Sequence, residues 1–454
     1  MNYDGSSVDN FPVNLGAQIA SAVAVSDIDN DGFKEIVAAT NSGLIKAINH
    51  DGTELFSYSL GGQIKGNPMI ADVDFNGSKE VVIANLTGDI VVLDASGNPV
   101  YGPANVAPGF LSSSALADLD EDNIMEFIGS QTTGDIVAIS LDTFEQIDGF
   151  PVSLGATSWN GPIVANIDAD NELEIVVATI QGDVAAIDTD GTIIFNNNYG
   201  NVRTSVVAYD LDSSGTPEII FGNNDGDLYV LESSGTTVGG FPISVGVAIE
   251  STPALVDFDS NGSIEMLFGD NSGYLHAINI NGNEADNFPI EILGTTSVAP
   301  SVKDADLDGD VEIVIPNSNS MHLIDFKRTS EVHLAYFKAN PERTGMFDNI
   351  VPNDSQDVEP VFSTRLISNY PNPFNPKTTI NFSVENSSNI KIIVFNILGQ
   401  EVKTLTNSVY SKGNHKLVWH GTDKHNNMVG SGVYFYKLIQ DGKQIETKKC
   451  LLLK

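Results

Sequence analysis

The chain has 454 residues and a formal net charge of −38 at pH 7, with 60 Asp and Glu against 22 Lys and Arg. Residues 1–356 hold 53 of the acids and 10 of the bases, whereas residues 357–454 hold 7 and 12. The acidic part should repel nucleic acid and anionic membranes, because both are bound through Lys and Arg. No run of about 18 apolar residues occurs, so we expect no membrane span. The single cysteine, Cys450, excludes an intramolecular disulfide.

Seven acidic nonapeptides recur along the first three quarters of the chain. They begin at residues 27, 72, 118, 166, 210, 257 and 304, at intervals of 45, 46, 48, 44, 47 and 47 residues. A period of about 40 to 50 residues is typical of a four-stranded propeller blade. Short β-branched runs separated by Asp, Asn and Gly fill each repeat and predict strands, which we call A to D. We therefore predict an all-β fold with a seven-bladed β-propeller over residues 1–348.

The nonapeptides, numbered acidic loops 1 to 7, have a composition that suits a hard cation. Side-chain oxygens stand at positions 1, 3 and 5, and a carboxylate stands at position 9 in all seven. Ca²⁺ takes about 6 to 8 oxygen ligands and tolerates irregular geometry. Ordinary Asp- and Asn-rich turns would not keep that ninth carboxylate. We predict up to seven structural Ca²⁺ ions with these ligands: Asp27, Asp29, Asp31, Glu35; Asp72, Asp74, Asn76, Glu80; Asp118, Asp120, Asp122, Glu126; Asn166, Asp168, Asp170, Glu174; Asp210, Asp212, Ser214, Glu218; Asp257, Asp259, Asn261, Glu265; Asp304, Asp306, Asp308, Glu312.

These loops resemble the FG-GAP/VCBS repeat of integrin-α-like propellers, over residues 1–348. The resemblance implies that Ca²⁺ is bound structurally, away from the ligand face. Loop 5 is expected to bind most weakly, because Ser214 stands where other loops have Asp or Asn. Asn123 and Asn171 replace the usual loop glycine, but Asn tolerates a left-handed backbone, so binding should survive.

The two ends of the repeat region match each other. Residues 2–16 resemble the C–D turn and strand D of the sixth repeat, at 279–294. We predict that the N-terminal strand completes the seventh blade, which would remove exposed sheet edges. The alternative is that the chain was cut from a longer array of blades. Its start lacks the pattern of a signal peptide, so we expect a fragment or a mis-assigned start.

No catalytic constellation is evident, and no catalytic or organic-cofactor residues are assigned. The seven histidines form no HExxH pair, and neither a GxSxG motif nor a nucleophilic cysteine setting occurs. Four Phe-Pro dipeptides resemble those of quinoprotein-like blades, although we expect them to be packing elements of strand D. They begin at Phe11, Phe150, Phe241 and Phe288.

A ligand would meet the propeller on the face that the acidic loops leave free. In an A–B–C–D blade the A–B loops lie on one face, and the B–C and D–A connections lie on the other. Propeller ligands usually sit over such a face near the central channel. The candidates there are Trp159, Phe110, Arg203, Asn224 and Asn271, since an aromatic ring beside amides suits a sugar. The alternative for Trp159 is a packing role between blades.

The C-terminal quarter forms a second module. Residues 349–362 read as a polar linker, and short runs in residues 363–454 predict an Ig-like β-sandwich of six or seven strands. The segments NYPNPFNPKTTINFSV, VFNILGQEVKTL and GNHKLVWHGTDKHNNMVGSGVYFYKL resemble the type A sorting domain of type IX secretion, in its flagellar-hook-cap-like variant. The resemblance implies the type IX secretion machinery as partner, and a place outside or on the outer membrane of a Bacteroidetes-like bacterium. The alternative is an ordinary Ig-like adhesion module.

We therefore expect a secreted or cell-surface, calcium-binding propeller protein that is non-enzymatic and binds an extracellular glycan or protein. The alternative is the C-terminal, non-catalytic part of a longer secreted exoenzyme, a peptidase or a polysaccharide lyase. A lyase site within this chain is disfavoured, because the repeat region has only 10 Lys and Arg with which to bind uronates.

Overall fold

The computed structural model describes residues 10–19, 21–168, 170, 172–257, 263–303, 311–318, 320–326, 331–334, 346, 364–370, 374–384, 387–397, 399–411, 413–425 and 427–453. The chain divides into two compact units, Met1–Pro352 and Asn353–Lys454. Every regular element in the described residues is a β-strand, so the predicted all-β class is confirmed. Accordingly, the described part has no helix that could cross a membrane.

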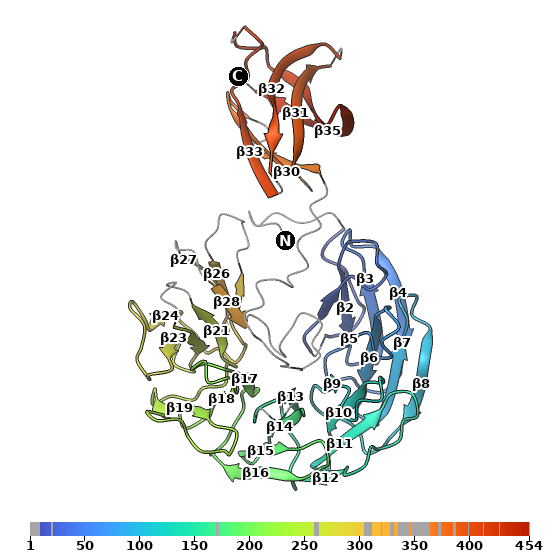
Figure 1. Cartoon of the computed structure of the whole chain (residues 1–454), viewed down its shortest axis with the longest axis vertical. Helices are drawn as coiled ribbons and strands as arrows, with labels where there is room; N and C mark the ends of the chain where they lie inside the picture. Colours follow the sequence, from blue (N-terminus) through green and yellow to red (C-terminus); the bar gives the residue numbers. More distant parts are fainter. Residues whose placement is uncertain are drawn as a thin grey trace. The chain divides into compact units, whose positions relative to one another are not determined.

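The first unit consists of antiparallel sheets set around a common centre (Figure 1). The first sheet has β1 (Ala24–Ser26), β2 (Glu35–Ala39), β3 (Leu44–Ile48) and β4 (Glu54–Ser59). The second has β5 (Met69–Ala71), β6 (Glu80–Ala84), β7 (Asp89–Leu93) and β8 (Pro99–Asn105). The third has β9 (Ala115–Ala117), β10 (Glu126–Ser130), β11 (Asp135–Ser140) and β12 (Val152–Ser153). The fourth has β13 (Ile163–Ala165), β14 (Glu174–Ala178), β15 (Asp183–Ile187) and β16 (Ile193–Asn198).

The remaining sheets of this unit are less uniform. The fifth has β17 (Val207–Tyr209), β18 (Glu218–Gly222), β19 (Asp227–Leu231) and β20 (Ile243–Ser244). The sixth has β21 (Ala254–Asp257), β22 (Glu265–Gly269), β23 (Tyr274–Asn279), β24 (Ile290–Glu291) and, beside β21, β28 (Glu331–Leu334). The last has β25 (Ser301–Lys303), β26 (Val311–Pro316) and β27 (Met321–Phe326).

The burial of the strands explains their patterns of apolar and polar residues. Every residue of β6, β10, β14, β18 and β22 is buried. These B strands are apolar without alternation, because neighbouring sheets cover both of their faces. The outer strands β8 and β16 are mostly exposed. The hydrophobic clusters bridge neighbouring sheets; one joins Phe221 of β18 to Phe268 of β22. Sheet-to-sheet packing is therefore what holds the strand ends, and the loops on them, in place.

The segment after β27 leaves its own sheet. Strand β28 pairs antiparallel with β21, placing Leu334 opposite Leu255 and Glu331 opposite Asp257. Met346 forms a parallel bridge with Val164 in β13. This stretch, which departs from the repeat pattern in sequence, thus contacts the A strands of two other sheets. Residues 2–9 lie outside the described residues, so N-terminal closure of the last sheet stays a prediction.

The second unit is a two-layered β structure. One sheet has β29 (Arg365–Tyr370), β30 (Thr378–Val384) and β33 (Gly413–Trp419). The other has β32 (Glu401–Tyr410), β31 (Ser388–Asn396), β34 (Gly432–Gln440) and β35 (Lys443–Leu452). Trp419 is fully buried between them, and its indole N–H donates to the carbonyl of Thr422 at 3.0 Å. Burial also raises the pKa of the Cys450 thiol to about 12, so this cysteine is an inert core residue. The predicted linker, residues 349–362, lies outside the described residues.

Candidate calcium loops and candidate ligand face

The ninth residue of acidic loops 1 to 6 is the first residue of the B strand that follows, and in loop 7 Glu312 is the second residue of β26. Glu126 opens β10 in this way and is completely buried. Its Oε2 accepts the main-chain N–H of Leu119, the second loop residue, at 2.7 Å. The same bond joins the second and ninth residues of loops 1, 2, 4 and 5 at 3.0, 3.1, 2.6 and 2.6 Å. The sheet therefore fixes one carboxylate in every such loop.

Main-chain N–H groups fold the rest of each loop around its own carboxylates. In loop 3 the N–H of Asp122 bonds to Oδ1 of Asp118 at 3.1 Å, and the N–H of Asn123 bonds to Oδ2 of Asp118 at 3.1 Å. The N–H of Ile124 bonds to Oδ1 of Asp122 at 2.8 Å. Asn123 has a φ of 70°, so Asn takes the left-handed place of the usual glycine, as predicted.

These turns bring carboxylate oxygens together in the five loops that the structure describes most fully. In each, three acidic residues place one oxygen each within 4.8 Å of the others. The groups are Asp27, Asp29 and Glu35; Asp72, Asp74 and Glu80; Asp118, Asp120 and Asp122; Asp168, Asp170 and Glu174; Asp210, Asp212 and Glu218. Sequence reasoning predicted all of these residues. In loops 6 and 7, Asp259, Asn261, Asp304, Asp306 and Asp308 lie outside the described residues.

Several carboxylate oxygens of the predicted ligands are buried without a hydrogen-bond partner. They are Oδ1 of Asp27 and Oε1 of Glu35, Glu126 and Glu174; Glu126 itself is outside the group of three that clusters in loop 3. A buried polar group without a partner costs about 1 to 3 kcal/mol, and more when it is charged. An all-oxygen donor set with unpartnered buried oxygens fits a hard cation such as Ca²⁺. Mixed carboxylate, amide and hydroxyl oxygens of varied number fit Mg²⁺ less well, because that ion demands a regular octahedron.

The raised pKa values of the ninth-position carboxylates also favour a bound cation. Burial, followed by the neighbouring Asp charges, raises the pKa of Glu126 to about 8, against the opposing effect of the Leu119 N–H. The same causes raise the pKa values of Glu80, Glu174 and Glu218 to about 7. A bound divalent cation would reverse this balance by favouring the ionised form.

The D–A connections of successive sheets present equivalent residues on the opposite face. The fifth residue before five of the A strands (β5, β9, β13, β17 and β21) is buried: Ile64, Phe110, Ser158, Val202 and Ile249. The fourth residue before the same strands is less buried: Lys65, Leu111, Trp159, Arg203 and Glu250. Phe110 belongs to the first set, is 2% exposed and packs edge-on against Phe127 at 4.8 Å. The prediction that Phe110 faces a ligand is therefore wrong.

Trp159 is 47% exposed, so the structure does not place it in the packing between sheets. The guanidinium carbon of Arg203 lies 5.5 Å from the centre of its ring. Nε of Arg203 lies 4.0 Å from Oε1 of Glu250. The side-chain amide of Asn160 donates to the carbonyl of Arg203 at 2.5 Å. The structure thus brings Trp159, Arg203, Glu250 and Asn160 together in one set of contacts.

The two predicted amides lie in B–C turns on the same face and are half-buried. The N–H of Asn224 bonds to the carbonyl of Asn201 at 2.9 Å, and that of Asn271 bonds to the carbonyl of Ala248 at 3.0 Å. Oδ1 of Asn224 is buried without a hydrogen-bond partner. Both turns are therefore anchored to the D–A connections that carry the candidate ligand residues.

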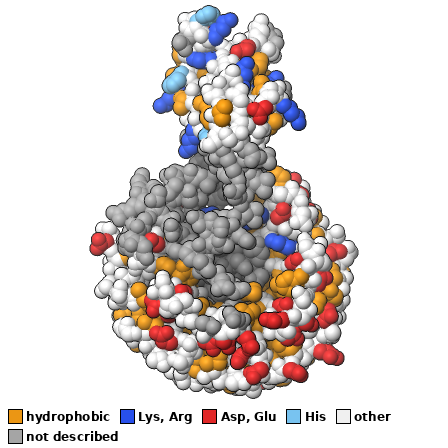
Figure 2. All heavy atoms as spheres, viewed as in Figure 1, with side chains coloured by type: hydrophobic (Ala, Val, Ile, Leu, Met, Phe, Trp, Pro, Cys, Tyr) orange, Lys and Arg blue, Asp and Glu red, His pale blue; other side chains and the backbone are white. Residues whose placement is uncertain are grey.

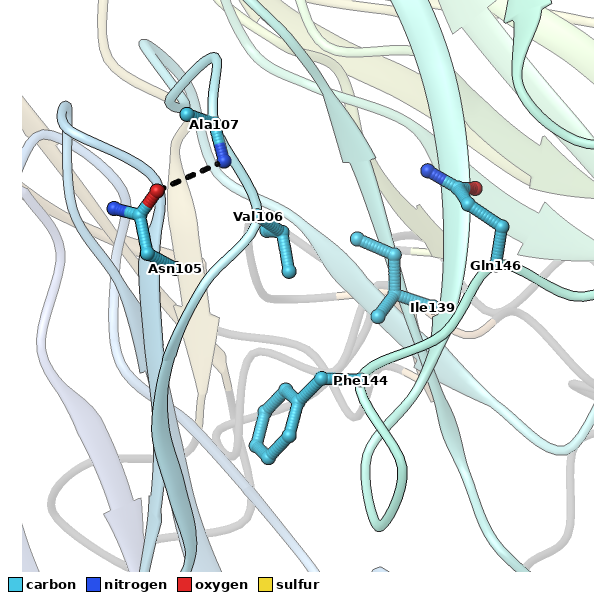
Figure 3. A pocket seen from close by; sticks show the side chains of 6 residues that line it. All are labelled: Asn105, Val106, Ala107, Ile139, Phe144 and Gln146. Atoms are coloured by element: carbon cyan, nitrogen blue, oxygen red, sulfur yellow. Dashed lines mark hydrogen bonds between the residues drawn. The ribbon is translucent and has the colours of Figure 1, made fainter.

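Two features were not predicted from the sequence. An open cavity of about 400 Å³ is lined by Asn105, Val106, Ala107, Ile139, Phe144 and Gln146 (Figure 3). The amide group of Asn105 is already bonded to Thr87 and Asp89, and its oxygen accepts the N–H of Ala107. Gln146 supplies the other amide of the lining, and the remaining residues are apolar, which does not identify a ligand class, so we assign no ligand.

The second unpredicted feature is a buried histidine between two carboxylates. Nε2 of His276 lies 3.3 Å from Oδ2 of Asp270, and Nδ1 lies 3.1 Å from Oε2 of Glu284. Burial by itself would lower the pKa of His276, but the bonds and charges of Glu284 and Asp270 outweigh it and raise the pKa. These residues lie 6 and 8 positions from His276 along the chain. The mostly apolar sequence of β23 could have indicated that His276 is buried, but not which residues are its partners.

Comparison with known proteins supports a propeller and an Ig-like domain. Residues 174–245 match the family described as the λ-carrageenase β-propeller domain, and residues 372–443 match the FlgD Ig-like domain. No curated protein matches the chain. Among solved structures, BamB from Moraxella catarrhalis is 18% identical with a TM-score of 0.50, over 69% of this chain and 85% of that one. A BBS1N structure, in complex with ARL6DN, is 11% identical with a TM-score of 0.48, over 69% and 93%. The chain is thus similar to β-propellers in its first unit and to FlgD-type Ig domains in its second.

Proposed function

We propose that this protein is a secreted or cell-surface β-propeller, stabilised by Ca²⁺, that binds an extracellular glycan or protein without catalysing a reaction. The observation that carries the calcium assignment is the set of buried, unpartnered carboxylate oxygens in the acidic loops, such as Oε1 of Glu126. A cation is the partner that these oxygens lack. Titration of the metal-free protein with Ca²⁺ by calorimetry tests this step, because several binding sites are expected.

The binding role is proposed because the two faces of the propeller carry different groups. The acidic loops lie on the A–B face, where their carboxylates would bind the cations. The other face presents Trp159 and Arg203 on anchored connections. We found no nucleophile with a general base in the described residues. Binding of glycans or proteins to an array, followed by loss of that binding in Trp159→Ala, tests the role directly.

We further propose that the sheets form seven blades of one closed ring. Asn10 supports this, because its side-chain amide donates to the carbonyl of Asp51 at 2.8 Å, beside Gly52 in the β3–β4 turn. Gly149 occupies the same place beside Gly191 in the β15–β16 turn. Both precede a Phe-Pro pair, so the N-terminal segment stands where the outer strand of a preceding blade would stand. Deletion of residues 1–16 should then lower the melting temperature of the whole propeller.

The second unit is proposed to be the signal for type IX secretion, which would place the protein outside the cell or on its outer membrane. Its match to an Ig-like domain and its dense resemblance to sorting domains support this role. Lys and Arg prevail on its described surface, unlike that of the larger unit (Figure 2). Such a charge difference suits a module that is recognised separately. Fusion of residues 353–454 to a reporter with a signal peptide, expressed in a host that has type IX secretion, tests the assignment.

A second candidate function is the non-catalytic part of a longer exoenzyme, a peptidase or a polysaccharide lyase. The match of residues 174–245 to a propeller domain of λ-carrageenase favours an association with polysaccharide-degrading proteins. The matched stretch runs from β14 to β20, most of two sheets, and lies within the first unit. The coding sequence upstream of Met1 distinguishes this candidate from a free-standing binding protein.

A further inference from the structure

Three neighbouring sheets present chemically different side chains at one equivalent position. Trp159, Arg203 and Glu250 each stand four residues before an A strand: β13, β17 and β21. The cation–π contact and the Arg203–Glu250 contact join the three into one surface, here called the Trp159 platform. Because the residue before each of them is buried, the sheets hold all three in place.

The platform is exposed and keeps its hydrogen-bonding capacity. Trp is mostly buried in proteins, yet Trp159 exposes nearly half of its surface. The side chain of Arg203 is 45% exposed, and its 4.0 Å approach to Glu250 is too long for a hydrogen bond. Asn160 fixes the backbone of Arg203 at 2.5 Å. A guanidinium that is held in place, exposed and not hydrogen-bonded to Glu250 is suited to recognise a ligand.

A sugar ring fits this combination of groups. Its C–H face can lie on the indole, whose large apolar ring has little conformational entropy to lose. The hydroxyl groups of the sugar can accept hydrogen bonds from the planar guanidinium of Arg203 and donate hydrogen bonds to the carboxylate of Glu250. The platform is open to solvent, so a polymer can lie across it.

The surrounding charge selects against acidic polymers. Arg203 and Glu250 cancel each other within the platform. The C strands β7, β11, β15 and β19 begin at the same end of the sheets, and each begins with an Asp: Asp89, Asp135, Asp183 and Asp227. This negative field repels sulfated or uronate-rich chains across about 8 Å at physiological salt. We propose that the Trp159 platform binds a neutral polysaccharide. This inference rests on the proposed function as a binding module.

The full-length chain in Ca²⁺ should be run in affinity gels that contain neutral polymers (galactomannan, xyloglucan or agarose) or acidic ones (λ-carrageenan or polygalacturonate). At least one neutral polymer should retard it, and neither acidic polymer should do so more strongly. Trp159→Ala and Glu250→Gln should each weaken retardation by about tenfold or more, equivalent to about 1.4 kcal/mol. Lys65→Ala is the matched control, because Lys65 holds the equivalent position before β5; it should bind as the parent does.

Three results would overturn the inference: no retardation by any neutral polymer, stronger retardation by an acidic polymer, or unchanged binding by Trp159→Ala. If Trp159→Ala also melts lower, Glu250→Gln, which keeps the size of a half-buried side chain, decides between lost folding and lost recognition. The melting temperature with and without Ca²⁺ is measured on the same samples. Stabilisation by Ca²⁺ without polysaccharide binding would refute the platform alone, whereas absence of both would refute the proposed function as well.

Discussion

Leu119 and Glu126 stand near opposite ends of acidic loop 3, and the N–H of Leu119 donates to Oε2 of Glu126 at 2.7 Å. The other oxygen, Oε1, is buried with no hydrogen-bond partner. One oxygen thus closes the loop, while the other is left for a cation. The equivalent bond in loops 1, 2, 4 and 5 indicates that the sheet presents the ninth carboxylate in the same way each time.

The first prediction is that Ca²⁺ stabilises the first unit. A ligand present at 100 times its Kd adds about 2.7 kcal/mol per site if the unfolded chain does not bind it. Several sites should therefore raise the melting temperature by many degrees between EDTA and millimolar Ca²⁺. Thermal unfolding followed by circular dichroism checks this. Equal melting temperatures in the two buffers would contradict the assignment.

The second prediction is that Glu126→Gln has opposite effects with and without metal. In Ca²⁺ the variant should lose one ion and unfold more easily, because a carboxylate ligand is gone. In EDTA it should be at least as stable as the parent, since burial opposes the charge of Glu126 and raises its pKa to about 8. Calorimetry and melting in both buffers provide the measurement.

Glu121→Gln is the control for that experiment. Glu121 lies in the same loop at the fourth position, where its side chain is exposed and is not one of the predicted ligands. Glu121→Gln should leave the number of bound Ca²⁺ ions unchanged, and its effect on stability should not differ in sign between Ca²⁺ and EDTA. A lower stability of Glu126→Gln in both buffers would mean that the carboxylate serves the fold rather than a metal.

The acidic loops could be predicted from the sequence because their chemistry is periodic. A ninth-position carboxylate such as Glu126 recurs at a fixed distance from Asp118, and the B strand that follows reads as buried β structure. The pairing of β28 with β21 could not be predicted, because EVHL has no counterpart in other repeats.

The ligand face was predicted only in part, because two of its candidates hold different positions in their D–A connections. Phe110 stands five residues before β9, whereas Trp159 stands four residues before β13. One residue is enough to turn a side chain from the exposed rim into the packing between sheets. Counting back from each A strand would have separated the two, whereas the contact of Arg203 with Glu250 needed the structure.

The third prediction ranks the metal sites. Asp29→Ala in loop 1 should destabilise the Ca²⁺-bound protein more than Asp212→Ala in loop 5. Loop 1 has Asp31 at its fifth position, whereas loop 5 has Ser214, whose hydroxyl lies 3.1 Å from that of Thr216. A loop with fewer charged ligands binds Ca²⁺ more weakly and loses less when one is removed. Equal losses of bound Ca²⁺ and of melting temperature would show that ligand charge does not set the affinity.

The fourth prediction concerns pH. The pKa of His276 is raised in the folded state, so its ion pairs stabilise the fold below the unfolded value near 6.5. That contribution is lost as the pH rises through the folded value. His276→Gln should therefore cost more stability at pH 6 than at pH 9, measured by urea unfolding in Ca²⁺. Glu284→Gln removes a main partner of His276 and should also reduce the pH dependence; a constant cost at both pH values would contradict it.

The fifth prediction separates the two units. A chain ending at Pro352 should keep the Ca²⁺-dependent melting of the first unit, because that unit is compact by itself. With a signal peptide it should fail to reach the cell surface, since the proposed sorting signal is gone.

Trp419→Ala in the full chain is the sharper variant. It empties the core of the second unit, at a cost of about 3 to 5 kcal/mol, and leaves the first unit untouched. Surface labelling of intact cells measures export; display of the truncated chain at the parent's level would refute the sorting role, while loss of Ca²⁺-dependent melting on truncation would refute the independence of the first unit.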